Sequence, residues 1–259
     1  MTHLFLSKNA AALKKLITQR TLFAFDLDGT LAPIVADPAH AGIPKTTLTL
    51  LCKLSTHTPV AVISGRSLRD LKHRTSGNFA HLVGNHGIEG IAEFRTQSIE
   101  ARGTCKKWAQ ALRRNGEGLD AGVVVEDKLY SLSLHYRMAR DRARARKKLI
   151  DLADNFEPQP RIVPGKCVLN LVPQNMPHKG TALVALMKQL RVKQALFIGD
   201  DQTDEDVFGM ISPRGLKIMT VRVGKKTRSK AQFYIRSQGD VERLLRAINE
   251  GWADELSLL

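Results

Sequence analysis

Two aspartates end an apolar run near the N-terminus, in the sequence Asp26-Leu27-Asp28-Gly29-Thr30. Residues two apart on an extended chain project to the same side, so the two carboxylates can act together. They could share a divalent cation, or one could attack an electrophile while the other transfers protons. Gly29 allows a sharp turn, and the hydroxyl of Thr30 can bind an anion. For the pair alone, a solvated turn at a strand end is the alternative.

A second acidic cluster lies in the sequence GDDQTDE, directly after another apolar run. It contains Asp200, Asp201, Asp204 and Glu205, whose mutual repulsion is costly unless a cation lies among them. Acids also favour the start of a helix, with Thr203 as its cap, and this alternative accounts for Asp204 and Glu205. It does not account for Asp200 and Asp201, which follow the apolar run immediately.

Two basic segments could bind an anion such as phosphate. Ser64-Gly65-Arg66 offers a hydroxyl, a backbone amide and a guanidinium just before an expected helix. Lys179 lies at the start of another expected helix. Each segment also has a simpler interpretation, which is a helix cap beside a surface arginine in the first case and a solvated charge in the second.

The elements that must position these side chains alternate between strands and helices. Apolar runs typical of buried parallel strands cover residues 22–25, 60–63 and 196–198. Helical patterns cover residues 46–54, 67–74, 179–190 and 204–210. This alternation predicts an α/β fold with right-handed crossovers, in which sites form at the carboxyl ends of the strands. The polar clusters lie at those ends.

The middle of the chain has a different pattern. Basic helical segments near residues 106–114 and 140–155 each precede a stretch in which apolar and polar residues alternate. Alternation is typical of a sheet with one solvated face. We therefore predict an inserted α/β module over residues 96–173, with a first domain built from residues 1–95 and 174–259.

Composition limits the class of protein. The 259 residues are 43% hydrophobic, which excludes disorder, and they carry a net charge of +15, which favours an anionic partner. That partner could be nucleic acid, an anionic surface or a phosphorylated small molecule. The densest basic segment, residues 137–148, is interpreted as the solvated face of a helix.

The cysteines and the N-terminal residues bear on location. Three scattered cysteines and the lack of a long apolar run predict a cytoplasmic protein that neither spans a membrane nor depends on disulfides. Leu13, Leu16 and Ile17 form an apolar stripe, which predicts an amphipathic first helix rather than a transit peptide.

Taken in order, the polar clusters resemble the four motifs of the haloacid dehalogenase-like phosphatases. Further motifs are similar to those of trehalose-6-phosphate phosphatases. They are FDLDGTLAPI, ISGRS, GNHGIE with His86 and Glu89, E-x-K with Glu126 and Lys128, HYR at 135–137, GKCV at 165–168, HKG and GDDQTDE. The resemblance covers residues 23–221, and it implies a Rossmann-like parallel-sheet core with residues 96–173 as a mobile α/β cap.

The resemblance also implies a mechanism and a set of site residues. Asp26 would attack phosphorus, Asp28 would transfer protons, and Mg²⁺ would be held by Asp26, the backbone carbonyl of Asp28 and Asp200. The other implied site residues are Ser64 and Lys179 at the phosphoryl group; Thr30, Arg66 and His86 toward the substrate; Asp201 and Asp204 behind the metal ligands; and Glu126, Lys128, Lys166 and Asn170 in the cap.

Asn170 departs from the family, which usually has a glutamate that contacts the sugar at this position. An amide can bind hydroxyls as donor and acceptor, but it carries no charge. The implied function is hydrolysis of trehalose 6-phosphate in trehalose biosynthesis, and the first alternative is the same chemistry on another sugar phosphate or a phosphorylated glycerate conjugate. A nucleic-acid-binding protein that uses residues 137–148 and a phospho-acceptor receiver module are alternatives of other classes. We expect a monomer that binds a small sugar phosphate and neither nucleic acid nor membrane.

Overall fold

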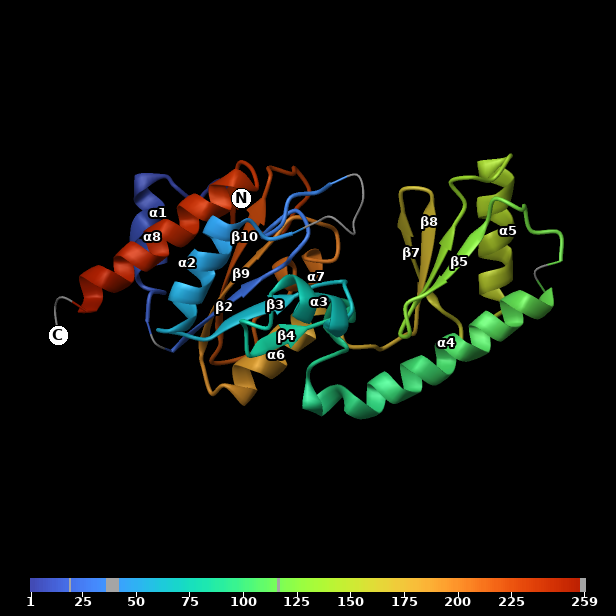
Figure 1. Ribbon diagram of the computed structural model, residues 1–259, viewed down its shortest axis with the longest axis horizontal. Helices are drawn as coiled ribbons and strands as arrows, with labels where there is room; N and C mark the ends of the chain where they lie inside the picture. The colour runs from blue at the N-terminus through green and yellow to red at the C-terminus, as the bar shows by residue number, and fades with distance from the viewer. Residues whose placement is uncertain (19, 36–41, 116, 257–259) are drawn as a thin grey trace. The chain divides into compact units, whose positions relative to one another are not determined.

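The computed structural model divides the chain into two compact units. It describes residues 1–18, 20–35, 42–115 and 117–256. The first unit comprises Met1–Ile91 and His178–Leu259, and the second comprises Ala92–Pro177. In Figure 1 the second unit is the green-to-yellow part of the ribbon. Its ends lie a few residues outside the segment 96–173 that we predicted as an insertion.

Seven parallel strands form the sheet of the first unit, in the order β1-β11-β10-β9-β2-β3-β4. Their bounds are β1 Thr2–His3, β11 Phe233–Ile235, β10 Lys217–Val223, β9 Gln194–Gly199, β2 Thr21–Phe25, β3 Val60–Ile63 and β4 His81–Val83. The strands β2 and β3 are buried along their whole length, which explains why they appear as unbroken apolar runs.

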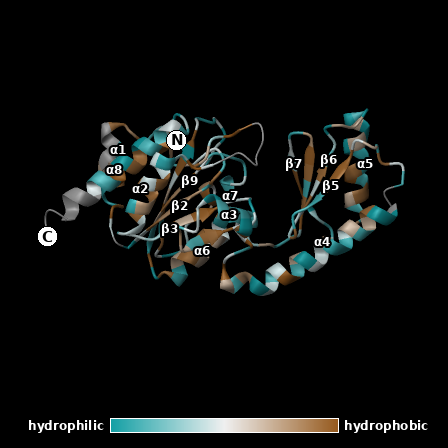
Figure 2. Ribbon diagram, in the orientation of Figure 1, coloured by the Kyte–Doolittle hydropathy of each residue, from teal (hydrophilic) through white to brown (hydrophobic). Residues whose placement is uncertain are grey.

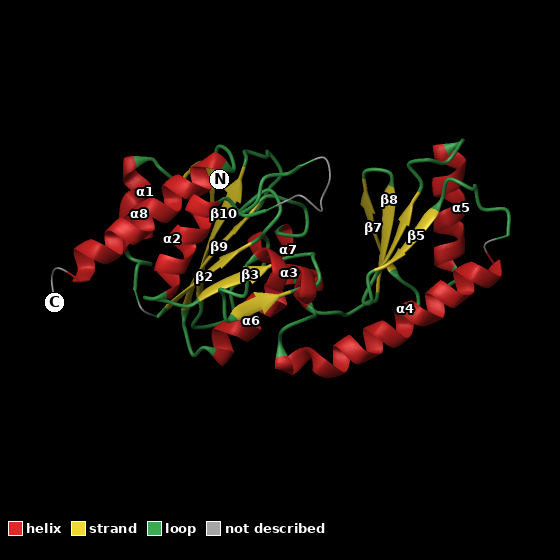
Figure 3. Ribbon diagram, in the orientation of Figure 1, coloured by secondary structure: helices red, strands yellow, loops and turns green. Residues whose placement is uncertain are grey.

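Helices flank this sheet (Figure 3). They are α1 Ser7–Lys14, α2 Lys45–Ser55, α3 Leu68–Arg74, α6 Lys179–Gln189, α7 Glu205–Phe208 and α8 Gly239–Leu256, with a short 3₁₀ helix, η2, at Asn85–Gly87. Buried leucines of α2 and α8 form one apolar cluster with Phe23 and Phe25 of β2 and Ile198 of β9. Polar loops follow the carboxyl ends of the strands.

The predicted first helix is wrong in its extent. Helix α1 ends at Lys14, so Leu16 and Ile17 follow it in a turn. Both are buried in the apolar cluster, and Ile17 lies so close to Gly251 of α8 that a Cβ there would overlap its side chain. Leu16 and Ile17 are therefore buried although neither belongs to the helix.

The second unit is an antiparallel sheet covered by two helices. The strand order is β5-β6-β8-β7, with bounds Val124–Asp127, Leu132–His135, Val168–Val172 and Arg161–Gly165. The helices are α4 Arg95–Asn115 and α5 Arg142–Asp154, and a 3₁₀ turn, η3, spans Ala92–Phe94. Trp108 of α4 and Leu149 of α5 pack with Leu134 and Leu169 on one face of this sheet.

The central strands of the first unit differ in hydropathy from the long helix α4. In Figure 2 the central strands β2, β3 and β9 are brown, whereas α4 carries teal along much of its length. Within the described part of the chain, no helix combines the length and apolar character that crossing a bilayer requires.

Candidate active site

The acidic residues of the first unit meet at a point fixed by the sheet topology. From β2 the chain proceeds to β3 and β4 on one side, and β9, β10 and β11 lie on the other. Where the strand order of an α/β sheet reverses in this way, a crevice forms at the carboxyl ends of the strands. Asp26 follows β2 and Asp200 follows β9, and these two strands are neighbours. The topology thus brings together the two acidic motifs that the sequence singles out.

A buried lysine connects these motifs. Nζ of Lys179, the first residue of α6, lies 2.9 Å from Oδ1 of Asp26 and 2.7 Å from Oδ1 of Asp204. All three side chains are at most 5% exposed. Burial raises the pKa of Asp26 well above its ordinary value, although Lys179 opposes this. Burial lowers the pKa of Lys179, but Asp26 and Asp204 more than compensate, so the ammonium stays charged.

The residues between β9 and α7 form a compact acidic turn, residues 200–204. Oδ2 of Asp204 accepts the backbone N–H groups of Asp200 at 2.8 Å and Asp201 at 2.9 Å. Oδ1 of Asp201 accepts the backbone N–H groups of Thr203 and Asp204 at 2.7 and 3.1 Å. Thr203 therefore does not cap the helix, although the alternative interpretation of these acids assumed that it does. Its hydroxyl donates to Asp201 at 2.8 Å, and Asp201 satisfies the amides of the turn.

The carboxylate of Asp200 is available to a cation. Its Oδ1 is buried and has no hydrogen-bond partner among the described residues. Burial, with Asp204 and Asp201 adding to it, raises the pKa of Asp200 to about 7. Asp26, Asp200 and Asp204 each offer an oxygen atom, and these atoms lie within 4.8 Å of one another. Since N–H donors already occupy both oxygens of Asp204, Asp26 and Asp200 fit a metal ion better.

Gly29 is required beside this carboxylate. Its φ of 81° is rarely adopted by other residues, and a Cβ there would overlap the carboxylate of Asp200. The next residue, Thr30, is fully buried, and its hydroxyl lacks a partner in the part of the chain that the structure describes. The DLDGT segment therefore brings an unengaged hydroxyl close to the acids.

Asp28 faces an arginine rather than the buried acids. Both of its oxygens accept N–H groups of Arg66 at 2.6 Å. Arg66 also donates to Asp70 at 2.9 Å, and Asp70 accepts from Arg74 at the same distance. Although burial opposes it, Arg74 and Arg66 hold the pKa of Asp70 below its usual value. This row of alternating charges fixes the side chain of Asp28, which is partly exposed to solvent.

The loops after β3 and β4 also lie together. The backbone N–H of His86 donates to the carbonyl of Ser64 at 2.9 Å, and the imidazole of His86 lies against Gly65. Ser64 is buried, and its hydroxyl accepts the N–H of Arg66 at 3.3 Å. Glu89, from the same motif as His86, accepts the N–H of Leu68 at 2.6 Å at the start of α3. The predicted anion-binding segment and the GNHGIE motif thus contact each other through hydrogen bonds.

The predicted sugar-binding residues belong to the second unit. Oε2 of Glu126 lies 2.9 Å from Nε2 of His135 and 3.7 Å from Nζ of Lys128. The side chains of this exposed group are 38% to 49% accessible to solvent. Lys166 is exposed in the turn between β7 and β8. These residues are available to a ligand but are not buried by the protein.

Asn170 lies in the same row of the sheet as Glu126. The register pairs Glu126 with Ser133, Ser133 with Asn170 and Asn170 with Val163, so these residues share one face. Oδ1 of Asn170 accepts the hydroxyl of Ser133 at 2.6 Å, and Nδ2 donates to the carbonyl of Val163 at 3.2 Å. One N–H and one lone pair of the amide remain for another partner.

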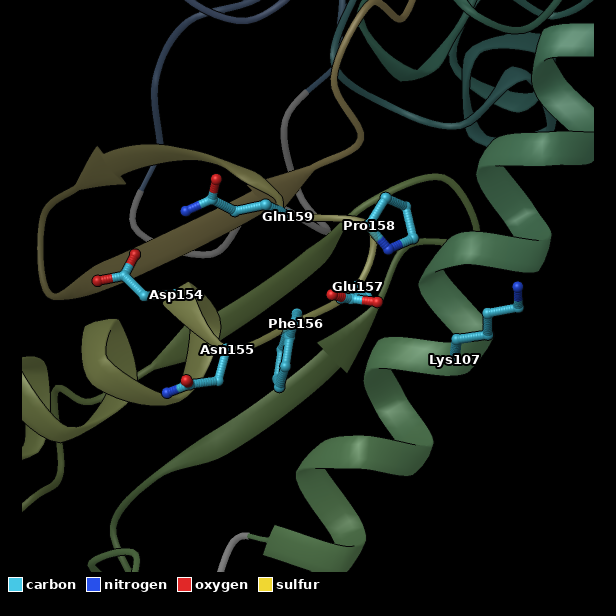
Figure 4. Close-up of a pocket in the computed structure, with 7 residues that line it drawn as sticks. All are labelled: Lys107, Asp154, Asn155, Phe156, Glu157, Pro158 and Gln159. Carbon is cyan, nitrogen blue, oxygen red and sulfur yellow. The ribbon is translucent and has the colours of Figure 1, made fainter.

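A pocket of the second unit, shown in Figure 4, lies elsewhere. It has a volume of about 780 Å³ and is lined by Lys107 and residues 154–159. It contains none of the predicted catalytic or sugar-binding residues. We therefore assign no role in the chemistry to it.

Sequence reasoning missed Arg222 of β10. Its side chain is 6% exposed, and it donates to the carbonyl of Asp200 and to the carbonyl of Asp201 at 3.1 Å. It also donates to Glu205 at 3.3 Å. The signal in the sequence is a basic residue inside a β-branched run, VRV, which follows GDDQTDE by one helix and one loop.

The chain is similar to known proteins in both sequence and fold. The family model for trehalose-phosphatase matches residues 24–238. A trehalose-phosphate phosphatase of Mycobacterium tuberculosis is 31% identical over 229 residues, which are 85% of this chain and 58% of that protein. This chain therefore spans somewhat more than half the length of that relative.

Solved structures share the fold. Aspergillus fumigatus trehalose-6-phosphate phosphatase superposes with a TM-score of 0.60 at 26% identity, and the C-terminal domain of the Candida albicans enzyme with 0.69 at 24%. In both cases the match covers 93% of this chain and 97% of the other. A haloacid dehalogenase-like hydrolase from Bacteroides thetaiotaomicron superposes with a TM-score of 0.60, which confirms the predicted fold class. The chain belongs to the trehalose-phosphatase family.

Proposed function

We propose that this chain is a Mg²⁺-dependent phosphatase that hydrolyses trehalose 6-phosphate through an aspartyl-phosphate. The observation that carries the proposal is the position of Asp26, which is paired with buried Lys179 and lies beside Asp200, whose Oδ1 has no described partner. A carboxylate held in this way can act as a nucleophile toward phosphorus. The family and its relatives in Mycobacterium supply the substrate class.

The donor set fits a hard divalent cation. Asp26 and Asp200 would hold Mg²⁺, together with the backbone carbonyl of Asp28, since carboxylate and carbonyl oxygens are its preferred ligands. Burial, with the charges of Asp204 and Asp201 adding to it, raises the pKa of Asp200 to about 7, and a bound cation would favour the ionised carboxylate. When bound, the ion supplies positive charge that offsets repulsion between the nucleophile and the phosphate dianion.

In the first step, the carboxylate of Asp26 attacks phosphorus, and the bond to the sugar oxygen breaks. Lys179 keeps Asp26 fixed and screens its charge, because the ammonium lies 2.9 Å from Oδ1. Ser64 and Thr30 offer hydroxyls to the phosphoryl oxygens. In the second step, water attacks the aspartyl-phosphate, which releases phosphate and restores Asp26.

Asp28 transfers the protons in both steps. It gives one to the departing sugar oxygen and takes one from the attacking water. Because both of its oxygens accept N–H groups from Arg66, a proton transfer requires that one of these hydrogen bonds is released. A phosphate dianion competes with Asp28 for the guanidinium, so arrival of the substrate supplies that release.

The second unit serves as the cap, and the first as the catalytic core. Glu126, Lys128 and Lys166 bind hydroxyls of the disaccharide, and Asn170 contributes its remaining N–H and lone pair. Asp201 and Asp204 act from behind the ligands by fixing the acidic turn. We place the enzyme in the cytoplasm as a monomer.

The test is phosphate release from trehalose 6-phosphate, with and without Mg²⁺. Glucose 6-phosphate and a phosphorylated glycerate conjugate are compared at the same concentrations. We expect hydrolysis of trehalose 6-phosphate that stops in EDTA and returns with Mg²⁺. Faster release from another phosphate ester would assign the same chemistry to that substrate, and full activity in EDTA would contradict the proposed site.

A further inference from the structure

Arg222 is held at the base of the acidic turn. The register of β10 and β9 pairs Arg222 with Gly199, the residue directly before Asp200. The side chain is 6% exposed, so its charge is almost completely removed from water. A buried guanidinium is costly unless its donors are paired with acceptors of good geometry. The acceptors that the guanidinium contacts therefore show which part of the structure it stabilises.

These partners lie at both ends of the acidic turn. One nitrogen of Arg222 donates to the carbonyl of Asp200, and another donates to the carbonyl of Asp201 at 3.1 Å and to the carboxylate of Glu205 at 3.3 Å. Glu205 begins α7 and also accepts the backbone N–H of Lys230 at 2.9 Å. The planar, forked guanidinium can span these acceptors at once, which a lysine ammonium does less well.

The turn is thus fixed from two sides. Its N–H groups are taken by the carboxylates of Asp204 and Asp201, and the carbonyls of Asp200 and Asp201 by Arg222. Among the described residues, the guanidinium donates to the carbonyl of Asp200 and not to its carboxylate, whose Oδ1 has no hydrogen-bond partner. Arg222 therefore supports Asp200 without occupying the atoms that bind a ligand.

We infer that Arg222 is a positioning residue for the divalent cation of the proposed function: it fixes the backbone of the acidic turn so that the Asp200 carboxylate is directed at the ion. This inference rests on the proposed function for the presence of the ion. Outer partners of metal ligands affect metal affinity by about 10- to 100-fold in other proteins. A purely structural Arg222 would contribute to stability alone.

The experiment compares Arg222→Met and Arg222→Lys with Arg246→Met, a control on α8 whose arginine is exposed and pairs with Glu242. Mg²⁺ binding to the full chain without substrate is measured by titration calorimetry, and thermal unfolding is measured in EDTA. We expect Arg222→Met to raise the Kd for Mg²⁺ at least about tenfold, Arg222→Lys to lie between it and wild type, and the control to leave the Kd unchanged.

An Arg222→Met protein that folds and binds Mg²⁺ within twofold of wild type would overturn the inference, whatever its unfolding temperature. If Arg222→Met does not fold, Arg222→Lys and Glu205→Gln decide the matter, since a Kd within twofold of wild type for both would also overturn it. Phosphate release is measured separately. A wild-type protein that binds Mg²⁺ but does not hydrolyse trehalose 6-phosphate contradicts the proposed substrate and leaves the Kd comparison intact, whereas one that binds no Mg²⁺ overturns both.

Discussion

Two groups of acids and bases in this chain differ most in their exposure to water. Around Lys179 the charged side chains are at most 5% exposed, and each contact is 2.9 Å or shorter. Around Glu126 the side chains are 38% to 49% exposed, and the ammonium of Lys128 lies 3.7 Å away. The first group lies in the first unit, in the loops after β2 and β9 and at the start of α6, and the second lies on the open face of the second unit.

The difference shows where rigidity and adaptability are placed. Removing one member of a buried pair leaves an uncompensated charge, so the fold itself holds the first group in one arrangement. An exposed ion pair contributes little to stability, so Glu126 can exchange its partners for sugar hydroxyls at low cost. In the proposed mechanism, the phosphoryl chemistry uses the buried group, and substrate selection uses the exposed one.

The largest expected effect is that of Asp26→Asn on turnover. An amide cannot form the aspartyl-phosphate, so phosphate release from trehalose 6-phosphate should fall by at least about a thousandfold. Lys179 retains Asp204 as its partner, and the fold should persist by circular dichroism. The control is Asp151→Asn, an exposed position on α5. Activity of Asp26→Asn within tenfold of wild type would remove the nucleophile from the mechanism.

Stability should separate the two groups when a lysine is removed from each. Lys179→Met leaves Asp26 and Asp204 buried without their cation, and the free energy of unfolding should fall by about 3 to 5 kcal/mol. Lys128→Met removes an exposed partner and should cost less than about 1 kcal/mol. Denaturant unfolding of both variants measures the contrast.

A second substitution tests the cause of the Lys179 effect. Adding Asp26→Asn to Lys179→Met removes one of the two uncompensated charges, so part of the lost stability should return. Equal losses in the Lys179→Met and Lys128→Met variants would show that burial does not distinguish the two groups.

Asp26 and the acidic turn stand out in the sequence because they follow strands that are buried on both faces. The strands β2, β3 and β9 are continuous apolar runs, and a polar residue that ends such a run stands out. Strand β10 has the sequence KIMTVRV. Its Lys, Thr and Arg interrupt the apolar pattern that would indicate a buried strand. Thr220 and Arg222 are buried there through hydrogen bonds to residues distant in sequence, and such contacts leave no local pattern.

The helices of the second unit show a related limit. We predicted a helical segment near residues 106–114, whereas α4 starts already at Arg95. Its first half includes exposed Ile99 and Gly103, which disturb the helical spacing of apolar residues. The contacts of Glu126 could not be fully predicted either, because the E-x-K spacing identifies Glu126 and Lys128 but not the approach of His135 from β6.

Substrate affinity should respond to Glu126 with little effect on stability or chemistry. Glu126→Gln removes a charged acceptor, and a hydrogen bond to a charged group contributes about 1.5 to 3 kcal/mol, so KM for trehalose 6-phosphate should rise about tenfold or more. The kcat should stay within about twofold, since the phosphoryl step occurs at Asp26. The control is Glu100→Gln, an exposed position on α4. A fall in kcat at unchanged KM would place Glu126 in the chemistry instead of the specificity.

The smallest effect should come from Asn170→Glu, which restores the usual family residue. The new carboxylate can still accept from Ser133, but it loses the N–H that donates to the carbonyl of Val163, so the free energy of unfolding should fall by about 1 kcal/mol. In return it offers a charged acceptor in the same row of the sheet as Glu126, and KM should fall severalfold at unchanged kcat. Steady-state kinetics with trehalose 6-phosphate measure both. If KM rises instead, the face around Asn170 selects a different sugar, because trehalose 6-phosphate would then bind the carboxylate less well than the amide.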